Sequence, residues 1–301
     1  MTYVEKKIAE IAPHDSQERF EEMGVTVLRD YAKFKDPKTV VVGNNEITAR
    51  RIVLATGSRA KIPNINGLDK VNYLTNESLF DLRKSPRHLA IIGGGPIGVE
   101  MAQAHARLGV KTTIIEINRI MQGYERRFVE PVHKSLIDDG VNILEGTVVD
   151  RVENDRSNIK LHLSSASALV VSDLLIAAGR APNIEKLALS EAGIKYNELG
   201  VIVDRNLQTT NRSVYAIGDI VDGPSFTHTA SYHAGIVLKK TLFGLSSTIQ
   251  TTHIPQVTYT DPEIASVGLN FNDAVKRFGN KVERSCVNLE SNDRAITDSK
   301  T

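Results

Sequence analysis

Two kinds of hydrophobic pattern meet near residue 88 of the chain. Before that point, short apolar runs separated by turn residues predict strands at 25–28, 39–42, 46–50 and 52–55. After it, apolar runs alternate with segments of helical periodicity, which predict strands at 88–92, 111–116 and 141–144 and helices at 97–108 and 127–138. Alternation of this kind is typical of βαβ units in a parallel sheet.

The remaining segments favour further strands with a few helices. Strands are predicted at 148–152, 160–163, 168–171, 174–177, 214–217 and 256–259, and helices near 77–82, 229–242 and 272–277. At the N-terminus, a helical pattern breaks at Pro13. Asp15 followed by Glu18 has the spacing of a capping box, which predicts a second short helix through Glu22.

The composition is that of a globular chain long enough for two domains, with 301 residues, 41% of them hydrophobic and 24% charged. The formal net charge of +1 provides no field for a nucleic acid or an anionic membrane. No apolar run reaches the roughly 18 residues of a membrane span, and the N-terminus does not resemble a secretory signal, so we expect a cytoplasmic protein. The single cysteine, Cys286, excludes an intrachain disulfide and a cysteine-based metal site, and we expect no bound metal.

The strongest motif is a G-x-G-x-x-G that follows a predicted strand and opens a predicted helix. It consists of Gly93, Gly94, Gly95, Pro96, Ile97 and Gly98. Gly93 permits a tight turn, Gly95 lets the backbone approach a pyrophosphate, and Gly98 lets the helix pack closely. The helix start offers free N–H groups and the positive end of the helix dipole to an anion. The motif therefore predicts a dinucleotide site.

Glu116 ends the second strand of this unit, 21 residues after Gly95. A carboxylate at this place accepts hydrogen bonds from the adenosine ribose hydroxyls, whereas a 2′-phosphate would meet like-charge repulsion. We therefore expect NAD rather than NADP, although the nearby Arg119 weakens the discrimination.

Two other predicted strands end in small or acidic residues. The strand at 52–55 runs into Thr56, Gly57 and Ser58, and the strand at 214–217 runs into Gly218 and Asp219. An aspartate at the carboxyl end of a strand can accept a hydrogen bond from a sugar or ribitol hydroxyl. Taken alone, each motif is better explained as a turn.

In their order along the chain, the motifs resemble those of the pyridine nucleotide–disulfide oxidoreductases, flavoenzymes such as dihydrolipoamide dehydrogenase, glutathione reductase and mercuric reductase. Segments with that resemblance are 55–58 (second FAD segment), 93–100 (NAD(P) fingerprint), 178–183 (A-x-G-R-x-P-N turn), 210–219 (flavin-ribitol segment) and 259–268 (opening of the dimer-interface domain). Residues 73–77 and 292–295 are most similar to the mercuric reductase branch. The resemblance extends over essentially the whole chain.

The resemblance implies an α/β fold with two cofactors. A doubly wound, Rossmann-like NAD domain at 87–204 would be inserted in a partial FAD domain, with pieces at 1–86 and 205–250, before the start of an α+β dimerisation domain at 251–301. FAD would be held by Thr56, Gly57, Ser58, Gly218, Asp219 and Ala230, and NAD by the glycine motif, Glu116 and Gly179. Glu100 would be the acid beside the nicotinamide, and the resemblance implies a homodimer.

The sequence departs from the family at both ends. Members carry an upstream FAD-binding G-x-G-x-x-G, a C-x4-C redox pair and a final H-x4-E segment, none of which this chain contains. We therefore expect an internal portion of a longer polypeptide. In the family, the acid at the position of Glu100 pairs with a lysine beside the redox disulfide, and that lysine would lie in the missing segment.

Two interpretations of the function remain open at this point. The first is an FAD-dependent, NAD(H)-linked oxidoreductase that passes hydride from nicotinamide to flavin and then electrons to a disulfide or metal ion. The second is a non-catalytic NAD-binding fragment without flavin. A lone-cysteine NADH oxidase is a third, but a predicted interface-domain strand at 285–287 favours a buried structural thiol at Cys286. His228 has either a flavin-side role or none, and His233 is expected to pack.

Overall fold

The computed structural model describes residues 2–164, 168–223, 225–245 and 247–299. The chain forms two compact units. Unit 1 comprises Met1–Lys61, Thr75–Ser85 and Gly179–Thr251, and unit 2 comprises Ile62–Leu74, Pro86–Ala178 and Thr252–Thr301. The predicted domain boundaries at 204/205 and 250/251 stay predictions. In this part of the chain, the compact units meet at 178/179 and 251/252.

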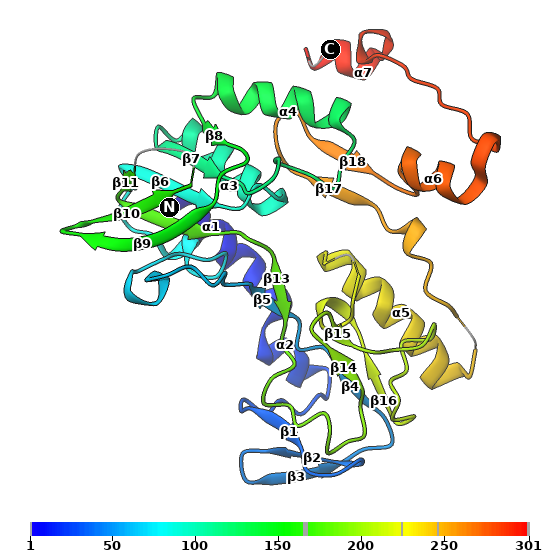
Figure 1. Ribbon diagram of the computed structural model, residues 1–301. Coiled ribbons are helices and arrows are strands. Elements are labelled where there is room, and N and C mark those ends of the chain that lie inside the picture. Colours follow the sequence, from blue (N-terminus) through cyan, green and yellow to red (C-terminus); the bar gives the residue numbers. More distant parts are fainter. Residues whose placement is uncertain (1, 165–167, 224, 246, 300–301) are drawn as a thin grey trace. The chain divides into compact units, whose positions relative to one another are not determined.

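Unit 2 is built on a four-stranded parallel sheet of order β12-β6-β7-β8 (Figure 1). Its elements are β6 (His88–Ile92), α3 (Pro96–Arg107), β7 (Lys111–Ile115), α4 (Arg126–Asp138), β8 (Asn142–Leu144) and β12 (Asp173–Ile176). The chain moves from β6 outward to β8 and then returns to the other side of β6, which is doubly wound topology. All five residues of β6 are buried, as an interior strand covered on both faces requires.

An antiparallel sheet of order β11-β10-β9 contributes to the same core. Its strands are β9 (Val149–Asp155), β10 (Asn158–Leu163) and β11 (Leu169–Val171), and the connector before β6 carries η2 (Leu68–Lys70). Side chains from this sheet and from the parallel sheet form one apolar cluster, which includes Leu161, Val171, Ile92 and Leu174.

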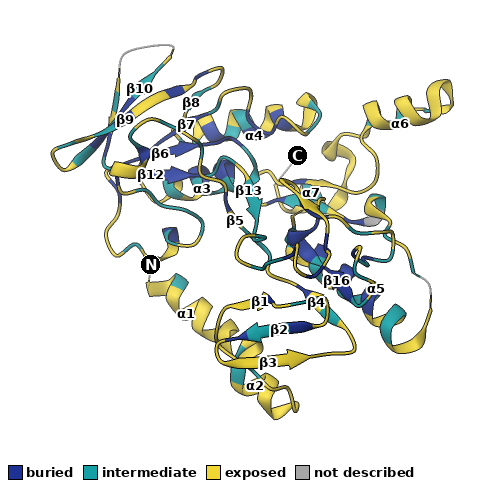
Figure 2. Ribbon diagram, turned by 60° about the horizontal axis from the view of Figure 1, so that its bottom comes forward, coloured by how far each residue is buried: buried dark blue, intermediate teal, exposed yellow. Residues whose placement is uncertain are grey.

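The C-terminal part of unit 2 is short and mostly exposed. Its elements are β17 (Gln256–Thr258), β18 (Ile264–Ser266), α6 (Phe271–Phe278), η6 (Gly279–Lys281), η7 (Leu289–Ser291) and α7 (Asp293–Thr297), after η5 (Thr251–His253). Strands β17 and β18 pair as an antiparallel hairpin. No residue of α6 or α7 is buried, in contrast to the dark-blue β6 in Figure 2.

Unit 1 brings distant segments together on a two-stranded parallel sheet. Its first elements are α1 (Thr2–Ile11), η1 (Ala12–Asp15), α2 (Gln17–Glu22), β1 (Ala32–Phe34), β2 (Thr39–Val42), β3 (Asn45–Thr48), β4 (Ile52–Leu54), β5 (Ser58–Ala60) and η3 (Leu79–Asp81). Its later elements are β13 (Arg180–Pro182), β14 (Tyr196–Asn197), β15 (Gly200–Val201), β16 (Val214–Ala216), η4 (Gly218–Ile220) and α5 (Thr227–Phe243). Strand β4 pairs in parallel with β16, and β5 pairs antiparallel with β13.

Three sequence predictions were wrong in unit 1. Residues 25–28 form no strand, and the antiparallel meander instead begins at β1, which the sequence analysis missed. Helix α2 is capped by Ser16, whose Oγ accepts from the Arg19 N–H, rather than by Asp15. Residues 77–82 contain a short 3-10 turn, η3, instead of an α-helix.

A fourth prediction was wrong in unit 2. Cys286 is exposed and lies outside any strand, because the segment after η6 has no strand partner among the described residues. Most of the other predicted strands and helices are present, with ends shifted by one to three residues. Within the described residues, the structure holds no helix that is both long and apolar enough to span a membrane.

Candidate functional site

The glycine motif lies between the end of β6 and the start of α3, where it packs too closely for larger side chains. Gly93 has φ +113°, and a Cβ there would collide with the Ala177 carbonyl. A Cβ on Gly98 would collide with the carbonyl oxygen of Gly93 itself. The tight turn and the close helix packing expected from these two glycines are therefore both present.

Gly95 differs from its neighbours because a Cβ at this position would meet no atom within 4 Å. It is the N-cap of α3, Pro96 follows in the first turn, and no side chain caps this helix. No side-chain hydrogen bond therefore caps the positive end of the helix dipole at the first turn of α3. An anion of phosphate size fits this arrangement.

Glu116 follows β7 and turns its carboxylate back onto the glycine motif. Its Oε2 accepts from the Gly94 N–H at 2.7 Å, and its Oε1 accepts from the Asn118 N–H at 2.9 Å. The Met121 N–H donates to the Gly94 carbonyl at 2.8 Å, so the two loops form one hydrogen-bonded surface. Glu116 is thus held beside the glycine motif, at the carboxyl edge of the sheet.

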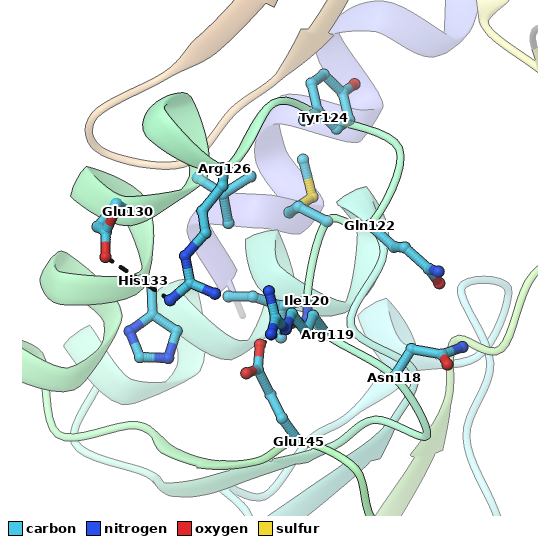
Figure 3. Close-up of a pocket in the computed structure, with 11 residues that line it drawn as sticks. Asn118, Arg119, Ile120, Gln122, Tyr124, Arg126, Glu130, His133 and Glu145 are labelled. Carbon is cyan, nitrogen blue, oxygen red and sulfur yellow. Dashed lines mark hydrogen bonds and ion pairs between the residues drawn. The ribbon is translucent and has the colours of Figure 1, made fainter. Parts of the chain in front are cut away.

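A cavity of about 630 Å³ opens beyond this loop, between residues 118–124 and the start of α4 (Figure 3). Arg119, Arg126 and Glu145 lie around it, and Glu145 Oε1 accepts from the Ile120 N–H at 2.9 Å. Its lining combines these charges with apolar and aromatic side chains, which suits a ring with polar substituents. Sequence reasoning noted Arg119 alone and missed the cavity, since its other walls come from α4 and β8.

Glu100 lies on α3 and points toward the segment after β17. The Tyr259 N–H donates to its Oε1 at 2.8 Å. Burial raises the pKa of the Glu100 carboxyl, and the hydrogen bond from Tyr259 lowers it by a smaller amount. Glu100 is therefore a half-buried acid that holds a proton at a higher pH than an exposed glutamate.

Gln103 continues the same face of α3. Its Oε1 accepts from the Asp261 N–H at 2.7 Å, and its Nε2 donates to the Asp261 carbonyl at 3.0 Å. Arg107, one turn further, donates to the Asp261 carboxylate at 2.9 Å. Sequence reasoning missed Gln103 because an amide on a helix carries no motif. Together with Glu100, these side chains hold the segment 259–261 against α3.

A second cluster forms in unit 1, at the carboxyl ends of β4 and β16. Because these strands are parallel neighbours, the turns after them lie at the same edge. The Ser58 Oγ donates to Asp219 Oδ2 at 2.6 Å. Arg180, from β13, donates through Nε to Ser58 Oγ at 2.6 Å and lies 3.3 Å from Asp219 Oδ2. Three segments separated by up to 161 residues thus meet at one carboxylate.

The turn that carries Thr56 and Gly57 is held by Asn183. Asn183 Nδ2 donates to the Thr56 carbonyl at 2.9 Å, and the Asn183 N–H donates to the Gly57 carbonyl at 2.9 Å. Gly57 has φ +65°, and a Cβ there would meet no atom within 4 Å. Asp219 Oδ1 forms no hydrogen bond within the described part of the chain. An open backbone and a carboxylate oxygen with remaining acceptor capacity fit a polyhydroxyl ligand.

Helix α5 packs on the other side of the Asp219 turn. Gly218 has φ +70°, and a Cβ there would approach the Cβ of Ala230 to 3.1 Å. His233 is buried, and its Nδ1 accepts from the Gly218 N–H at 3.1 Å. Sequence reasoning assigned His233 to packing alone and named Arg180 only within its turn. Both roles depend on long-range pairing that local patterns do not reveal.

Three remaining candidates lie apart from these clusters or have no shown role. Gly179 has φ +109° and belongs to unit 1, where its carbonyl accepts from the Lys61 N–H at 2.9 Å. His228 is exposed at the start of α5 and stacks on Phe226 with ring centroids 5.3 Å apart. Cys286 contacts the guanidinium of Arg127 at the surface.

Comparison with known proteins gives relatives over nearly the whole chain. It is 36% identical to a mercuric reductase of Bacillus cereus over 93% of this chain and 45% of that protein. It is 34% identical to a mercuric reductase of Lysinibacillus sphaericus over 100% of this chain and 56% of that protein. A dihydrolipoyl dehydrogenase of Geobacillus stearothermophilus is 33% identical over 90% of this chain and 59% of its own length. The chain spans about half the length of these relatives.

Solved structures give the same result. The HOCl-induced flavoprotein disulfide reductase RclA from Escherichia coli matches with a TM-score of 0.82 and 29% identity, over 90% of this chain and 63% of that one. The fold is therefore the Rossmann-like α/β fold of flavoprotein disulfide reductases. A family model described as pyridine nucleotide-disulphide oxidoreductase matches residues 5–234. The chain belongs to the pyridine nucleotide-disulphide oxidoreductase family.

Proposed function

We propose that this chain is the nucleotide-binding portion of an FAD-dependent, NAD(H)-linked oxidoreductase of the mercuric reductase and dihydrolipoyl dehydrogenase type. One observation carries the proposal: the open face of Gly95 at the uncapped start of α3, with Glu116 held beside it. When bound, the two cofactors supply hydride transfer from nicotinamide to the flavin ring. The residues of this chain bind, orient and exclude water.

In unit 2, the glycine motif would bind the pyrophosphate of NAD and Glu116 its adenosine ribose. The first-turn N–H groups of α3 would donate to the phosphate oxygens, and the absence of a Cβ at Gly95 would allow the close approach. Glu116 would exchange its bonds to the Gly94 and Asn118 N–H groups for bonds to ribose hydroxyls. The cavity with Arg119 and Arg126 would receive the adenine.

NAD rather than NADP is the proposed nucleotide, because the Glu116 carboxylate repels a 2′-phosphate. Arg119 and Arg126 oppose this preference, since either guanidinium could pair with a phosphate. A direct comparison of NADH and NADPH affinity tests the assignment: NADH should bind more tightly, and equal or tighter binding of NADPH overturns it.

In unit 1, Thr56, Gly57, Ser58, Gly218, Asp219 and Ala230 would hold FAD. Ser58 and Arg180 engage only Oδ2 of Asp219. Its Oδ1 would accept from a ribitol hydroxyl. Ala230 keeps α5 close enough to Gly218 to hold the turn in place.

Glu100 is the proposed acid near the nicotinamide, and its raised pKa suits a group that holds a proton close to a redox centre. The electron acceptor would be a disulfide or a metal ion, as the names of the relatives suggest. Because Cys286 is the single cysteine of the 301 residues, no redox pair comes from this sequence. A homodimer is proposed from the family alone.

Three measurements on one purified sample test the proposal: the intact mass, the visible spectrum and a titration with NADH. Flavin absorbance after purification or after FAD addition, together with NADH binding, supports it. A colourless protein that binds NADH but no added FAD supports the alternative of an NAD-binding fragment. A protein that binds neither nucleotide contradicts both.

A further inference from the structure

His233 is the one buried side chain of α5 whose hydrogen bond reaches the backbone of the Asp219 turn within the described residues. Its Nδ1 accepts from the Gly218 N–H at 3.1 Å. Only a deprotonated ring nitrogen can accept, so the bond requires the neutral imidazole with its proton on Nε2. Gly218 is itself buried, so this N–H has no access to water if the imidazole is removed.

Two backbone hydrogen bonds also hold the turn. The Ile217 N–H donates to the Leu54 carbonyl at 2.9 Å, and the Gly218 carbonyl accepts from the Val221 N–H at 3.0 Å. The turn packs closely on α5, since a Cβ on Gly218 would approach the Ala230 Cβ to 3.1 Å. Within the described residues, the bond from the Gly218 N–H to His233 Nδ1 is thus the single hydrogen bond between α5 and the turn that carries Asp219.

We propose that His233 is a positioning residue of the flavin-side site: its neutral Nδ1 holds the Gly218 N–H and thereby fixes Asp219 toward the ribitol of FAD. This inference rests on the proposed function for the ligand, whereas the positioning itself is a property of the chain. His233 touches the turn and has no role in the reaction itself.

The environment of His233 keeps it neutral. Burial lowers the pKa of the imidazole, and no charged group contributes to this shift. The titratable groups on the surrounding elements are Tyr232 on its own helix, with ring centroids 6.1 Å apart, Tyr215 on β16 and Asp219 on η4. Tyr215 is bonded to Gln208, and Asp219 to Ser58 and Arg180. Protonation of Nδ1 would place its N–H against the Gly218 N–H, so that two donors face each other. Acid should therefore break the hydrogen bond between His233 and the turn.

Two substitutions separate this acceptor role from packing. In His233→Asn, the side-chain oxygen occupies about the position of Nδ1 and accepts at any pH, whereas His233→Leu fills the space with no acceptor. Tyr232→Phe is the matched control, because it removes a different hydrogen bond of the same helix, to the Gln250 N–H at 3.0 Å. None of these residues belongs to the proposed binding set.

The readout is amide hydrogen exchange of Gly218 by NMR, expressed relative to intrinsic exchange, from mildly acidic to neutral pH. The native chain should protect this amide at neutral pH and lose protection in acid. His233→Asn should protect it at every pH, and His233→Leu should exchange roughly five- to a hundredfold faster at neutral pH, the range for an unpaired buried donor. Tyr232→Phe should follow the native chain. Native-like protection in folded His233→Leu, or no rescue in folded His233→Asn, overturns the proposal.

An FAD titration of the same proteins adds the functional arm. His233→Asn should bind FAD as the native chain does. His233→Leu should bind it more weakly, by up to the factor by which its Gly218 exchange increases. Equal FAD affinity in all variants overturns the link to the ligand. If the native chain binds no FAD, the proposed function fails in unit 1, and the exchange data still decide whether His233 holds the turn.

Discussion

The two candidate sites of this chain are built in opposite ways. The glycine motif of unit 2 is one continuous segment, and its backbone would form the proposed binding surface at the start of α3. The Asp219 cluster of unit 1 is assembled from turns after β4 and β16 and from β13, joined by side-chain hydrogen bonds of 2.6 Å. The first depends on the absence of side chains, and the second on particular side chains across long sequence separations.

This difference predicts how each site fails. A side chain added at Gly93 or Gly98 collides with backbone atoms, so the substitution destabilises unit 2 itself. A substitution in the Asp219 cluster removes one bond from a network, so the fold remains and the carboxylate loses its orientation.

Gly98→Val should give the largest effect, because its Cβ would collide with the Gly93 carbonyl. We expect the free energy of unfolding of unit 2 to fall by about 3 kcal/mol, the upper part of the usual range for overpacking. Chemical denaturation followed by circular dichroism measures it. Gly235→Ala is the control, because a Cβ at Gly235 meets no atom within 4 Å. Native-like stability of Gly98→Val would contradict the close packing of α3.

Arg180→Met should affect unit 1 more than Arg59→Met does. Arg180 is 26% exposed and bonds both Ser58 and Asp219, whereas Arg59 is 45% exposed and pairs with Glu185 at the surface. Loss of charge-assisted bonds at Arg180 should cost about 2 kcal/mol of unfolding free energy, against less than about 1 kcal/mol at Arg59. Denaturation curves and FAD titrations of both variants decide. Equal losses in the two variants would show that the bonds of Arg180 to Ser58 and Asp219 stabilise unit 1 no more than a surface ion pair does.

Acid should destabilise both units through one buried histidine each. Burial, and then the charge of Lys111, lower the pKa of His88 from its usual 6.5, and burial lowers that of His233. Below pH 6.5 the unfolded chain therefore binds more protons than the folded one, and the free energy of unfolding falls as the pH falls through the folded pKa values. Each group contributes at most about 1.4 kcal/mol per pH unit.

Thermal unfolding between neutral pH and pH 5 measures this effect. His88→Asn should reduce the acid loss in unit 2, where the His88 Nε2 now lies 2.9 Å from Thr113 Oγ1, and His233→Asn should reduce it in unit 1. Glu100 acts with the opposite sign, since its raised pKa lowers stability as the pH rises above about 4.5, its usual value. An unchanged pH profile in both histidine variants would show that other groups control the acid loss.

Cys286→Ser should have the smallest effect. The thiol is exposed, lies in neither site and contacts Arg127 at the surface. We expect a change in unfolding free energy within about 0.5 kcal/mol and unchanged NADH affinity. Any oxidase activity of the native chain that this variant lost would instead assign a redox role to the cysteine.

The sequence predicted unit 2 better than unit 1, for a physical reason. The βαβ order, the tight turn at Gly93 and the close packing at Gly98 follow from local periodicity and glycine geometry, and the structure contains them. In unit 1, strand β1 was missed because neither hydrophobic periodicity nor turn residues mark Ala32–Phe34. The roles of Arg180 and His233 depend on partners 122 and 15 residues away, which no local pattern contains.

Local sequence patterns also failed to predict some surface features. An interface-domain strand was predicted at 285–287, but a strand forms only with a partner, and the segment has none among the described residues. The bonds of Gln103 to the backbone of Asp261 likewise depend on how a distant segment meets α3. The identities of site residues in a continuous motif are thus easier to predict than those of an assembled cluster.

We expect the start of α3 to bind the pyrophosphate of a dinucleotide at Gly95. Calorimetric titration of NADH into the native chain and into Gly95→Ala tests it most directly, with thermal unfolding of both proteins alongside. Because a Cβ at Gly95 meets no protein atom, the two should unfold at the same temperature. The native chain should bind NADH, and Gly95→Ala should bind it at least about tenfold more weakly, a loss of about 1.4 kcal/mol. Equal affinity in the two proteins, or no binding to the native chain, would contradict the account.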